Sequence, residues 1–363
     1  MIKSGWKRLL QVALLSILIA ALFSTAAVAS NNLTVHFLDV GQGDSELIQF
    51  DNKNVLIDGG VQDMGPRVES YLRDHGVSSL DLVVATHPHE DHIGGLLKVL
   101  NDFPVMQVLD SGQPHTSQIY ESFLTLIDNK NIPYKVGERG QTIDLDPSLK
   151  IEVLSPPAAH FPDDLNQNSI VLRIVYNQVS FLLMGDAGFE AENSIMATGY
   201  DLKSTILKVG HHGSSSATGQ AFLNVVHPSV QIIEVGAGND YGHPTQQTLA
   251  ALQQAGSATY RTDLDGNIVV TTDGVSYTVS TQKQSVASTV SQKKTSDYVQ
   301  PTGAITSNSA ASQQFVGSTK SNKYHYPSCS AAQKIKPANE IWFTSTEDAR
   351  ARGYVPCGIC HPP

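Results

Sequence analysis

The residues best suited to chemistry lie in one short segment, 86–95, which places four potential metal ligands within six positions. These ligands are His87, His89, Asp91 and His92. An apolar run directly precedes them, so the segment is expected to start at the C-terminal end of a strand. Neutral imidazole and carboxylate oxygen suit Zn²⁺ and, less tightly, Mn²⁺. The spacing predicts that His87 and His89 bind one ion while Asp91 and His92 bind a second.

Residues 33–280 have the pattern of a domain that could position this segment, because short β-rich runs alternate with loops containing Gly, Pro and Asp. The expected strands are 33–38, 44–50, 54–57, 82–85, 105–109, 151–154, 169–176, 179–184, 206–209, 230–235, 268–272 and 276–280. The expected helices are 65–75, 92–102, 116–129, 188–198, 217–226 and 245–255. The step Asn177-Gln178 predicts a hairpin. Strands with intervening helices indicate a layered α/β domain.

Further motifs, taken together with the histidine-rich segment, resemble those of the metallo-β-lactamase fold superfamily. These motifs are Phe37–Ser45, Leu56–Gly60, Leu182–Asp186, Lys208–Ser214 and Asn239–Pro244. Over residues 33–280 the combination is most similar to the extracytoplasmic nuclease-like domain of the ComEC competence proteins. The resemblance implies an αββα four-layer sandwich. Since the sequence shows no membrane-spanning region like theirs, it also implies a free-standing, secreted relative.

The same resemblance implies a role for Asp186, which stands where the family places a carboxylate that bridges two metal ions. A carboxylate between two cations offsets their mutual repulsion, and we expect Asp91 and Asp186 to be the catalytic residues. His243 is expected to supply the remaining ligand of the Asp91 and His92 site.

His211 is expected to complete the site of His87 and His89, with the adjacent His212 as an alternative. Many relatives use a mid-chain histidine for this position. The present sequence has Asn166-Gln167-Asn168-Ser169 there instead, which is a departure from the family pattern.

Asp39 and Asp58 each allow two interpretations. The resemblance favours both as acceptors that orient ligating histidines, whereas their neighbouring glycines favour ordinary turn residues. Ser214 and Tyr241 could hydrogen-bond a substrate oxyanion or could simply be loop residues.

Hydrolysis is the reaction that such a site favours. Two divalent metal ions about 3.5–4 Å apart can hold a bridging hydroxide and stabilise a leaving oxygen. The resemblance favours a phosphodiester of DNA as the substrate. Other members hydrolyse lactams, lactones or thioesters with the same metal chemistry. The alternatives for this chain are a secreted hydrolase of another bond, such as a phosphocholine ester or a lactam, and a non-catalytic binding protein on the same fold.

Charge is distributed unevenly along the chain, whose formal net charge is −10. Residues 30–280 carry 12 basic and 30 acidic side chains, whereas residues 281–363 carry nine basic and four acidic ones. An acidic domain is a poor general binder of polyanions. Attraction to nucleic acid is therefore expected from the basic C-terminal segment.

The N-terminus has the pattern of a secretory signal. Lys3, Lys7 and Arg8 precede the apolar run 9–23, and Ala27-Val28-Ala29 supplies small residues for cleavage. We expect secretion after cleavage near Ala29, and an uncleaved membrane anchor is the alternative. No further span is expected in the mature chain.

The composition divides the chain into four expected parts. They are a signal peptide at 1–29, a hydrolase domain at 30–280, a Ser/Thr/Gln-rich linker at 281–318 and a small module at 319–363. A module this short is expected to need a metal or covalent staple.

All three cysteines lie in this module, where His325, Cys329, Cys357 and Cys360 form a tetrahedral zinc set. The pattern resembles the metal-binding module of Ada-type DNA repair proteins, with a histidine in place of the first cysteine. His361 is a possible substitute ligand. A Cys357–Cys360 disulfide or a redox-active pair is the alternative. The complete chain is thus expected to hold two Zn²⁺ or Mn²⁺ ions in the main site and one structural zinc.

Overall fold

The computed structural model describes most of the chain outside the N-terminal 30 residues. The described residues are 31–162, 164–283, 288–290, 315–327, 329, 331–343, 346–352, 354–357 and 360. They belong to two compact units, within Met1–Lys293 and Lys294–Pro363, called here the N-terminal and C-terminal units. The expected signal peptide at 1–29 and most of the expected linker lie outside the described residues, and the four domain boundaries stay predictions.

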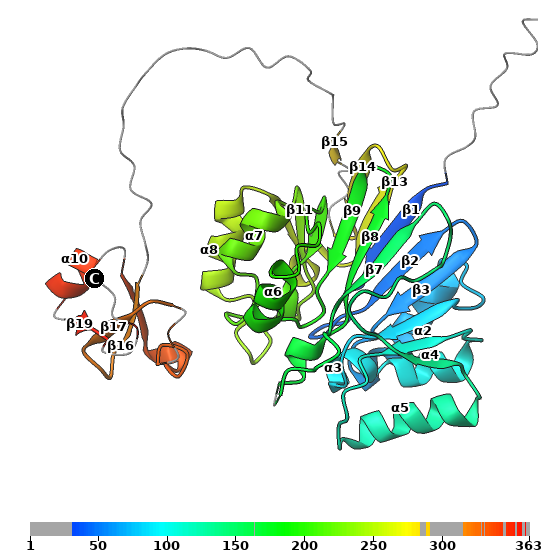
Figure 1. Cartoon of the computed structure of the whole chain (residues 1–363), viewed down its shortest axis with the longest axis horizontal. Helices are drawn as coiled ribbons and strands as arrows, with labels where there is room; N and C mark the ends of the chain where they lie inside the picture. The colour runs from blue at the N-terminus through cyan, green and yellow to red at the C-terminus, as the bar shows by residue number, and fades with distance from the viewer. Residues whose placement is uncertain are drawn as a thin grey trace, which may run out of the picture. The chain divides into compact units, whose positions relative to one another are not determined.

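The first sheet of the N-terminal unit has nine strands in the order β15-β14-β13-β1-β2-β3-β4-β5-β6 (Figure 1). The strands are β1 (Leu33–Phe37), β2 (Glu46–Phe50), β3 (Lys53–Ile57), β4 (Leu82–Ala85), β5 (Val108–Asp110), β6 (Tyr134–Val136), β13 (Ile268–Thr272), β14 (Tyr277–Thr281) and β15 (Ser288–Val290). Strands β3 to β6 pair in parallel, and the others pair antiparallel.

The second sheet has six strands in the order β12-β11-β10-β9-β8-β7. The strands are β7 (Lys150–Ser155), β8 (Val171–Tyr176), β9 (Val179–Leu183), β10 (Ile206–Lys208), β11 (Val230–Ile233) and β12 (Ala258–Arg261). The expected hairpin joins β8 to β9, and Asn177 there has a φ of 53°. Asparagine tolerates this left-handed conformation better than most side chains.

The inner faces of the two sheets pack against each other. Phe37 and Val84 of the first sheet share one buried apolar cluster with Phe181 and Ile206 of the second. These side chains alternate with outward ones such as Val83, because successive side chains of a strand point to opposite faces. The central core is therefore a layer between two sheets.

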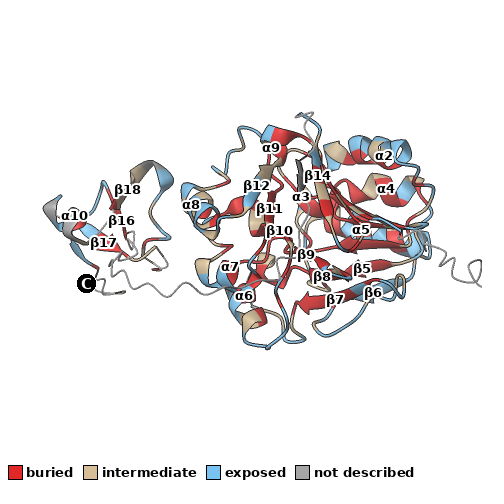
Figure 2. Ribbon diagram, turned by 90° about the horizontal axis from the view of Figure 1, so that it is seen from above, coloured by how far each residue is buried: buried red, intermediate tan, exposed pale blue. Residues whose placement is uncertain are grey.

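Helices cover both outer faces, as Figures 1 and 2 show. On the first sheet lie α2 (Gly65–Asp74), α4 (Leu96–Asp102) and α5 (Gln118–Asn129); on the second lie α6 (Phe189–Met196), α7 (Gln220–Val226) and α8 (Gln246–Ala255). The short helices are η1 (Gln62–Met64), α3 (Glu90–Ile93), η2 (Asn166–Asn168), η3 (Gly210–Gly213) and α9 (Thr262–Asp265). This arrangement is the four-layer αββα sandwich that the family resemblance implied.

The expected helix at 92–102 is divided into α3 and α4 at Gly94 and Gly95. A Cβ atom on Gly95 would lie 2.0 Å from the carbonyl oxygen of Gly59, and the Gly95 N–H donates to the Gly60 carbonyl at 2.9 Å. The glycines thus allow the segment to lie directly against the loop that follows β3. This close approach fixes α3, which carries Asp91 and His92.

The C-terminal unit contains a four-stranded sheet in the order β18-β16-β17-β19. Its elements are β16 (Phe315–Ser318), β17 (Lys323–His325), η4 (Pro337–Asn339), β18 (Glu340–Phe343), α10 (Thr346–Ala351) and β19 (Val355–Pro356). Two small apolar clusters form its core, one centred on Phe315 and Phe343 and the other on Val316, Cys329 and Cys357.

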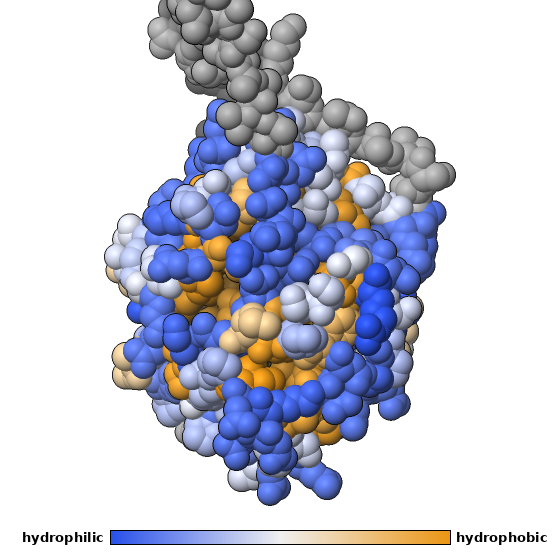
Figure 3. Space-filling view, turned by 90° about the vertical axis from the view of Figure 1, so that its right-hand side faces the viewer, coloured by the Kyte–Doolittle hydropathy of each residue, from blue (hydrophilic) through white to orange (hydrophobic). Residues whose placement is uncertain are grey.

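Among the residues that the structure describes, no helix has the length and apolar character needed to cross a membrane. On the face of the N-terminal unit drawn in Figure 3, apolar surface lies in recesses between hydrophilic side chains.

Candidate metal centre

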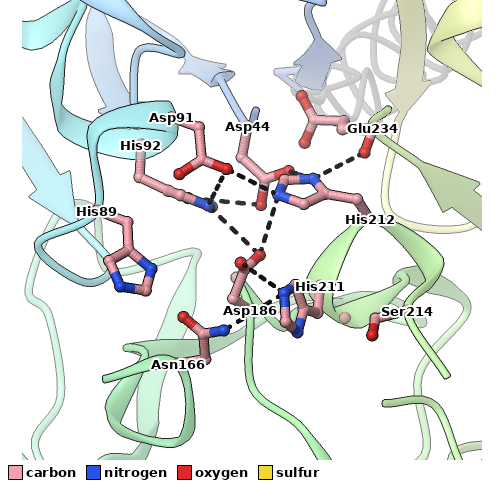
Figure 4. A network of polar contacts seen from close by, with 12 residues as sticks. Asp44, His89, Asp91, His92, Asn166, Asp186, His211, His212, Ser214 and Glu234 are labelled. Atoms are coloured by element: carbon pink, nitrogen blue, oxygen red, sulfur yellow. Dashed lines mark hydrogen bonds and ion pairs between the residues drawn. The ribbon is translucent and has the colours of Figure 1, made fainter. Parts of the chain in front are cut away.

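The candidate ligands gather where strands of the two sheets end. His87 and His89 follow β4 of the first sheet, and Asp186 follows β9 of the second. His211 and His212 lie in η3, directly after β10. Figure 4 shows His92, His211 and His212 grouped around Asp186.

Asp186 presents one carboxylate oxygen to each of two ligand sets. Its Oδ1 lies 3.4 Å from the Nε2 of His92 and 3.4 Å from the Nε2 of His212. Its Oδ2 lies 3.8 Å from the Nε2 of His87 and 3.6 Å from the Nε2 of His211. This is the placement that a carboxylate bridging two cations requires.

The first set, called here the Asp91 set, consists of Asp91, His92, His212 and Asp186 Oδ1. One ligand atom from each residue lies within 4.8 Å of the others. The Nε2 atoms of His92 and His212 and the Oδ1 of Asp186 are buried, and none has a hydrogen-bond partner in the described part of the chain. Such atoms are costly unless something satisfies them. Two imidazoles and two carboxylates fit a zinc or manganese ion.

The pKa of His212 reflects the strong negative electrostatic potential within this set. Burial lowers the pKa of His212, but the carboxylates of Asp186 and Asp44 outweigh that effect and raise the pKa to about 10. A field that favours a proton on a buried imidazole also favours a divalent cation, which binds the neutral imidazole instead.

His212 is a member of the Asp91 set, and the ligand role predicted for His243, whose Nδ1 is buried without a hydrogen bond among the described residues, stays a prediction. His211 and His212 both have left-handed backbone angles, with φ of 49° and 52°. His212 is consequently buried against Asp91 and Asp186 Oδ1, while His211 faces Asp186 Oδ2. The ring of His243 lies 5.7 Å from that of His211. The two adjacent histidines are therefore not alternatives, because the structure directs each to a different ligand set.

The second set, called here the His87 set, consists of His87, His89, His211 and Asp186 Oδ2. It is more open than the Asp91 set, because among the described residues its ligand atoms do not all lie within 4.8 Å of one another. The Nε2 of His87 lies 3.0 Å from the Nδ1 of His89. Asn166 stands beside this set, with its Nδ2 atom 3.3 Å from the Nε2 of His211 and its Oδ1 buried without a partner in the described residues. The amide thus lies where the family pattern predicts a histidine, and it can offer an oxygen in place of a nitrogen ligand.

Asp58 holds His92 in the orientation that metal binding needs. The Nδ1 of His92 donates to Asp58 Oδ2 at 2.7 Å, which leaves Nε2 facing Asp186. Thr86 donates to the same carboxylate from its backbone N–H at 2.8 Å and from its hydroxyl at 2.6 Å. The contact is the one expected of an acceptor that orients a ligand.

Asp39 has the contacts of a turn residue, which is the second of its two interpretations given above. Its Oδ1 accepts the Gly41 N–H at 3.4 Å, and its Oδ2 lies 3.7 Å from Arg67 and 3.6 Å from Lys283. These are contacts of a turn residue near the surface, so the expectation that Asp39 orients a ligating histidine is not met. Ser214, proposed as an oxyanion contact, lies 3.0 Å from Ser216, whose hydroxyl is 3.4 Å from His211 Nδ1.

Asp44 and Lys208 form a buried ion pair beneath the Asp91 set that sequence analysis did not single out. Both side chains are fully buried, and Lys208 also donates to the carbonyl of Gly185 at 3.1 Å. Asp44 Oδ1 lies 3.2 Å from the Nδ1 of His212. Burial raises the pKa of Asp44, but Lys208 and His212 outweigh that effect, so the pKa is lowered. The pair joins a loop of the first sheet to the residue that precedes Asp186.

Two further carboxyl groups, Glu46 and Glu234, are buried beside this pair. Burial and the charge of Asp44 raise the pKa of Glu46 to about 8, and burial raises the pKa of Glu234 well above its usual range. Glu234 accepts the Ser45 N–H at 3.0 Å, and its backbone carbonyl accepts from His212 Nδ1 at 3.0 Å. The sequence offers a signal for these residues, because Glu46 begins, Lys208 ends and Glu234 directly follows a mostly apolar strand.

The C-terminal unit contains a second ligand cluster. His325, Cys329, Cys357 and Cys360 bring one ligand atom each to within 4.8 Å of one another. No disulfide joins the cysteines in the described part of the chain, and His325 Nδ1 is buried without a hydrogen bond there. Burial and the neighbouring thiols raise the pKa of Cys360 to about 12. Three thiols and one imidazole fit a closed zinc site; His361 lies outside the described residues.

Comparison with known proteins agrees with both sites. The metallo-beta-lactamase superfamily profile matches residues 38–233, and the profile of the metal binding domain of Ada matches residues 303–363. ComE operon protein 3 of Bacillus subtilis (strain 168) is 31% identical over 252 residues, covering 64% of this chain and 32% of its own. Competence protein ComA of Neisseria gonorrhoeae is 32% identical over 242 residues, covering 66% of this chain and 32% of its own.

The chain thus spans about a third of the length of these curated relatives. Among solved structures, the metallo-beta-lactamase fold protein YhfI from Bacillus subtilis has a TM-score of 0.45 at 13% identity, covering 66% of this chain and all of that protein.

Removing Lys208 should strongly destabilise the N-terminal unit. In Lys208→Met the buried carboxylate of Asp44 loses its counter-charge, which costs about 3–5 kcal/mol when a buried pair is broken. Chemical denaturation of the metal-free protein measures this change. The double variant Lys208→Met/Asp44→Asn should regain much of the loss, and Lys203→Met, at an exposed lysine, should change stability by less than about 0.5 kcal/mol. A loss below about 1 kcal/mol in Lys208→Met would contradict the role of the pair.

Zinc should hold the C-terminal unit together. A thiol-reactive probe should label the three cysteines only after chelation, because thiolates bound to zinc are protected and metal binding there is coupled to folding. Cys329→Ser should release the metal, whereas His325→Cys should retain it as a four-thiolate site. The assignment fails if mass spectrometry of the purified chain finds a Cys357–Cys360 disulfide and no zinc.

Proposed function

The chain belongs to the metallo-β-lactamase superfamily and has the fold of a metal-dependent hydrolase, and on this basis we propose that it is a secreted, two-metal phosphodiesterase that cleaves DNA. The observation that carries the proposal is the position of Asp186, with one oxygen directed to each ligand set. One bridging carboxylate flanked by histidines on both sides supports two metal ions rather than one.

The metal ions would supply an activated water and electrostatic stabilisation of a phosphoryl group. The protein's own residues provide the framework for this chemistry. Asp58 fixes the tautomer of His92, and Asp44 with the Glu234 carbonyl fixes that of His212, so that both Nε2 atoms face Asp186. The partly exposed side chains of Asp91 and His211 lie where the buried centre meets solvent.

A DNA substrate is supported by the relatives and by the charge of the C-terminal unit. One relative is named Competence protein ComA, another ComE operon protein 3, and a third, from Haemophilus influenzae, Recombination protein 2. In the C-terminal unit Lys320, Lys323, Lys334 and Lys336 line a groove of about 420 Å³. A cluster of lysines attracts the negatively charged phosphate backbone, whereas the acidic N-terminal unit is a poor general binder of polyanions.

A second candidate is hydrolysis of a thioester. Hydroxyacylglutathione hydrolase of Prochlorococcus marinus (strain NATL1A) is 31% identical over 94 residues, which cover 26% of this chain. The shared segment is much shorter than the one shared with the competence proteins, so we favour the phosphodiester. Assays with DNA, a small phosphodiester, a thioester and a lactam, each with Zn²⁺, Mn²⁺ and chelator, distinguish the classes.

Secretion forms part of the proposal because the N-terminal residues have a basic, apolar and small-residue order. N-terminal sequencing of the protein from the culture medium of its host should find a chain that begins at or near Ser30. Recovery of the full-length chain from the membrane fraction alone would show an uncleaved anchor.

Loss of either a bridging or a terminal ligand should abolish hydrolysis. Asp186→Asn and His89→Asn should each lower kcat about a thousandfold or more, since metal ions supply several kcal/mol of transition-state stabilisation. Circular dichroism should show that both variants fold. Asp201→Asn, at an exposed carboxylate, serves as the control and should keep full turnover. Unchanged turnover in both ligand variants would exclude the two-metal reaction.

Neutralising the groove lysines should weaken DNA binding without affecting chemistry. Replacing Lys320, Lys323, Lys334 and Lys336 by glutamine should make the salt dependence of single-strand binding shallower, by about 0.7 in log–log slope for each lost phosphate contact. Turnover of a small phosphodiester should stay the same because the metal centre lies in the other unit. An identical slope in the two proteins would mean that the C-terminal unit does not attract DNA.

A further inference from the structure

The motif Tyr241-Gly242-His243-Pro244 lies beside the two ligand sets and carries a large exposed ring. It lies in the loop between β11 and α8. Tyr241 is 68% exposed, which is unusual for so large a ring. Its ring stacks on that of His243, with centroids 5.8 Å apart and an interplanar angle of 22°. The His243 ring thus lies nearly parallel to Tyr241 but offset from it, and most of the Tyr241 side chain is open to solvent.

This pair of rings continues directly from the metal centre. The ring of His243 meets the ring of His211 edge to face, at a centroid distance of 5.7 Å and an angle of 75°. The Nε2 of His211 in turn lies 3.6 Å from Asp186 Oδ2. A series of three rings thus runs from the bridging carboxylate to the protein surface, and Tyr241 is its outer end.

The loop that carries Tyr241 is held in one conformation by Asn239. The Asn239 side-chain oxygen accepts the backbone N–H groups of Tyr241 and His243, each at 3.1 Å. The side-chain nitrogen donates to the carbonyls of Gly236 at 2.9 Å and His243 at 2.7 Å. The Gly236 N–H donates to Gln42 Oε1 at 3.2 Å, which links the loop to the segment between β1 and β2 of the first sheet. An exposed ring on a fixed loop loses little conformational entropy when a ligand stacks on it.

We propose that Tyr241 is a stacking platform for a nucleobase of the strand whose phosphodiester lies at the metal centre. The proposal rests on the phosphodiesterase function and deepens it, because it makes a base-bearing strand the preferred substrate. A planar base can cover the open face of Tyr241 with the offset geometry that aromatic pairs favour. Stacking on a tyrosine is tolerant of sequence, since every base has a π-face. The platform would therefore select single-stranded nucleic acid over phosphodiesters without bases.

A hydrogen bond from the Tyr241 hydroxyl to a phosphate oxygen is the competing role. The two roles predict different effects of a phenylalanine at position 241. Tyr241→Phe keeps the ring and removes the hydroxyl, so it preserves stacking and abolishes the hydrogen bond. Tyr241→Ala removes both.

Binding to two matched single strands tests the proposal in the full-length, zinc-loaded protein. One strand is a phosphorothioate oligonucleotide, which resists cleavage, and the other has the same backbone with abasic residues throughout. Fluorescence anisotropy gives Kd for each strand. Tyr241→Ala should raise the Kd of the base-bearing strand about tenfold and leave the abasic strand unchanged, since one stacked base contributes an effect of this order. Tyr241→Phe should match the wild type on both strands.

The control variant is Tyr200→Ala, at a tyrosine that is 40% exposed and whose hydroxyl lies beside Gly140, in a segment that supplies none of the ligands. It should change neither Kd. Equal effects of Tyr241→Ala on both strands, or no effect on either, would overturn the stacking role, as would a Tyr241→Phe variant as weak as Tyr241→Ala. Cleavage of ordinary DNA is assayed separately. A wild type that discriminates the two strands but does not cleave ordinary DNA would contradict the phosphodiesterase function and leave the stacking role standing.

Discussion

The burial of negative charge between the two sheets is the constraint on which this structure depends. Carboxylates removed from water must be paired, protonated or bound to a cation, because an isolated buried charge is very unfavourable. Asp44 is paired with Lys208, and Asp58 accepts from His92. Glu46 avoids the cost by a raised pKa. Asp186 is compensated by imidazoles alone, since four histidine Nε2 atoms lie 3.4–3.8 Å from its oxygens and its Oδ1 is buried without a hydrogen bond in the described residues. Two divalent cations would complete the charge balance of the interface.

The backbone around the centre is shaped by the need to bring ligands from both sheets to this carboxylate. Glycines at 94 and 95 allow α3 to approach the loop after β3, which fixes His92. On the opposite side, two consecutive left-handed residues turn His211 and His212 towards different oxygens of Asp186. Left-handed angles in non-glycine residues are strained, and strain of this kind persists where the surroundings impose it. The Lys208 contact to Gly185 ties the two sides together beneath the site.

Much of this arrangement follows from local sequence pattern. The strand before His87, the hairpin at Asn177-Gln178 and most helices were predictable from apolar periodicity and turn residues. The short edge strands β6 and β12 were not, because their residues are largely exposed and lack an apolar pattern. The placement of His212 beside Asp91 could not be predicted from the sequence, since it depends on backbone angles that only the packed loop imposes. The buried role of Lys208 depends likewise on contacts with residues more than 160 positions away.

X-ray diffraction from zinc-loaded crystals at the zinc absorption edge tests the central claim most directly. Anomalous maps should show two peaks in the N-terminal unit, one beside each carboxylate oxygen of Asp186. The first should lie among Asp91, His92 and His212, and the second beside His87, His89 and His211. A single peak, or none, in crystals grown with excess zinc would contradict an interface built around two cations.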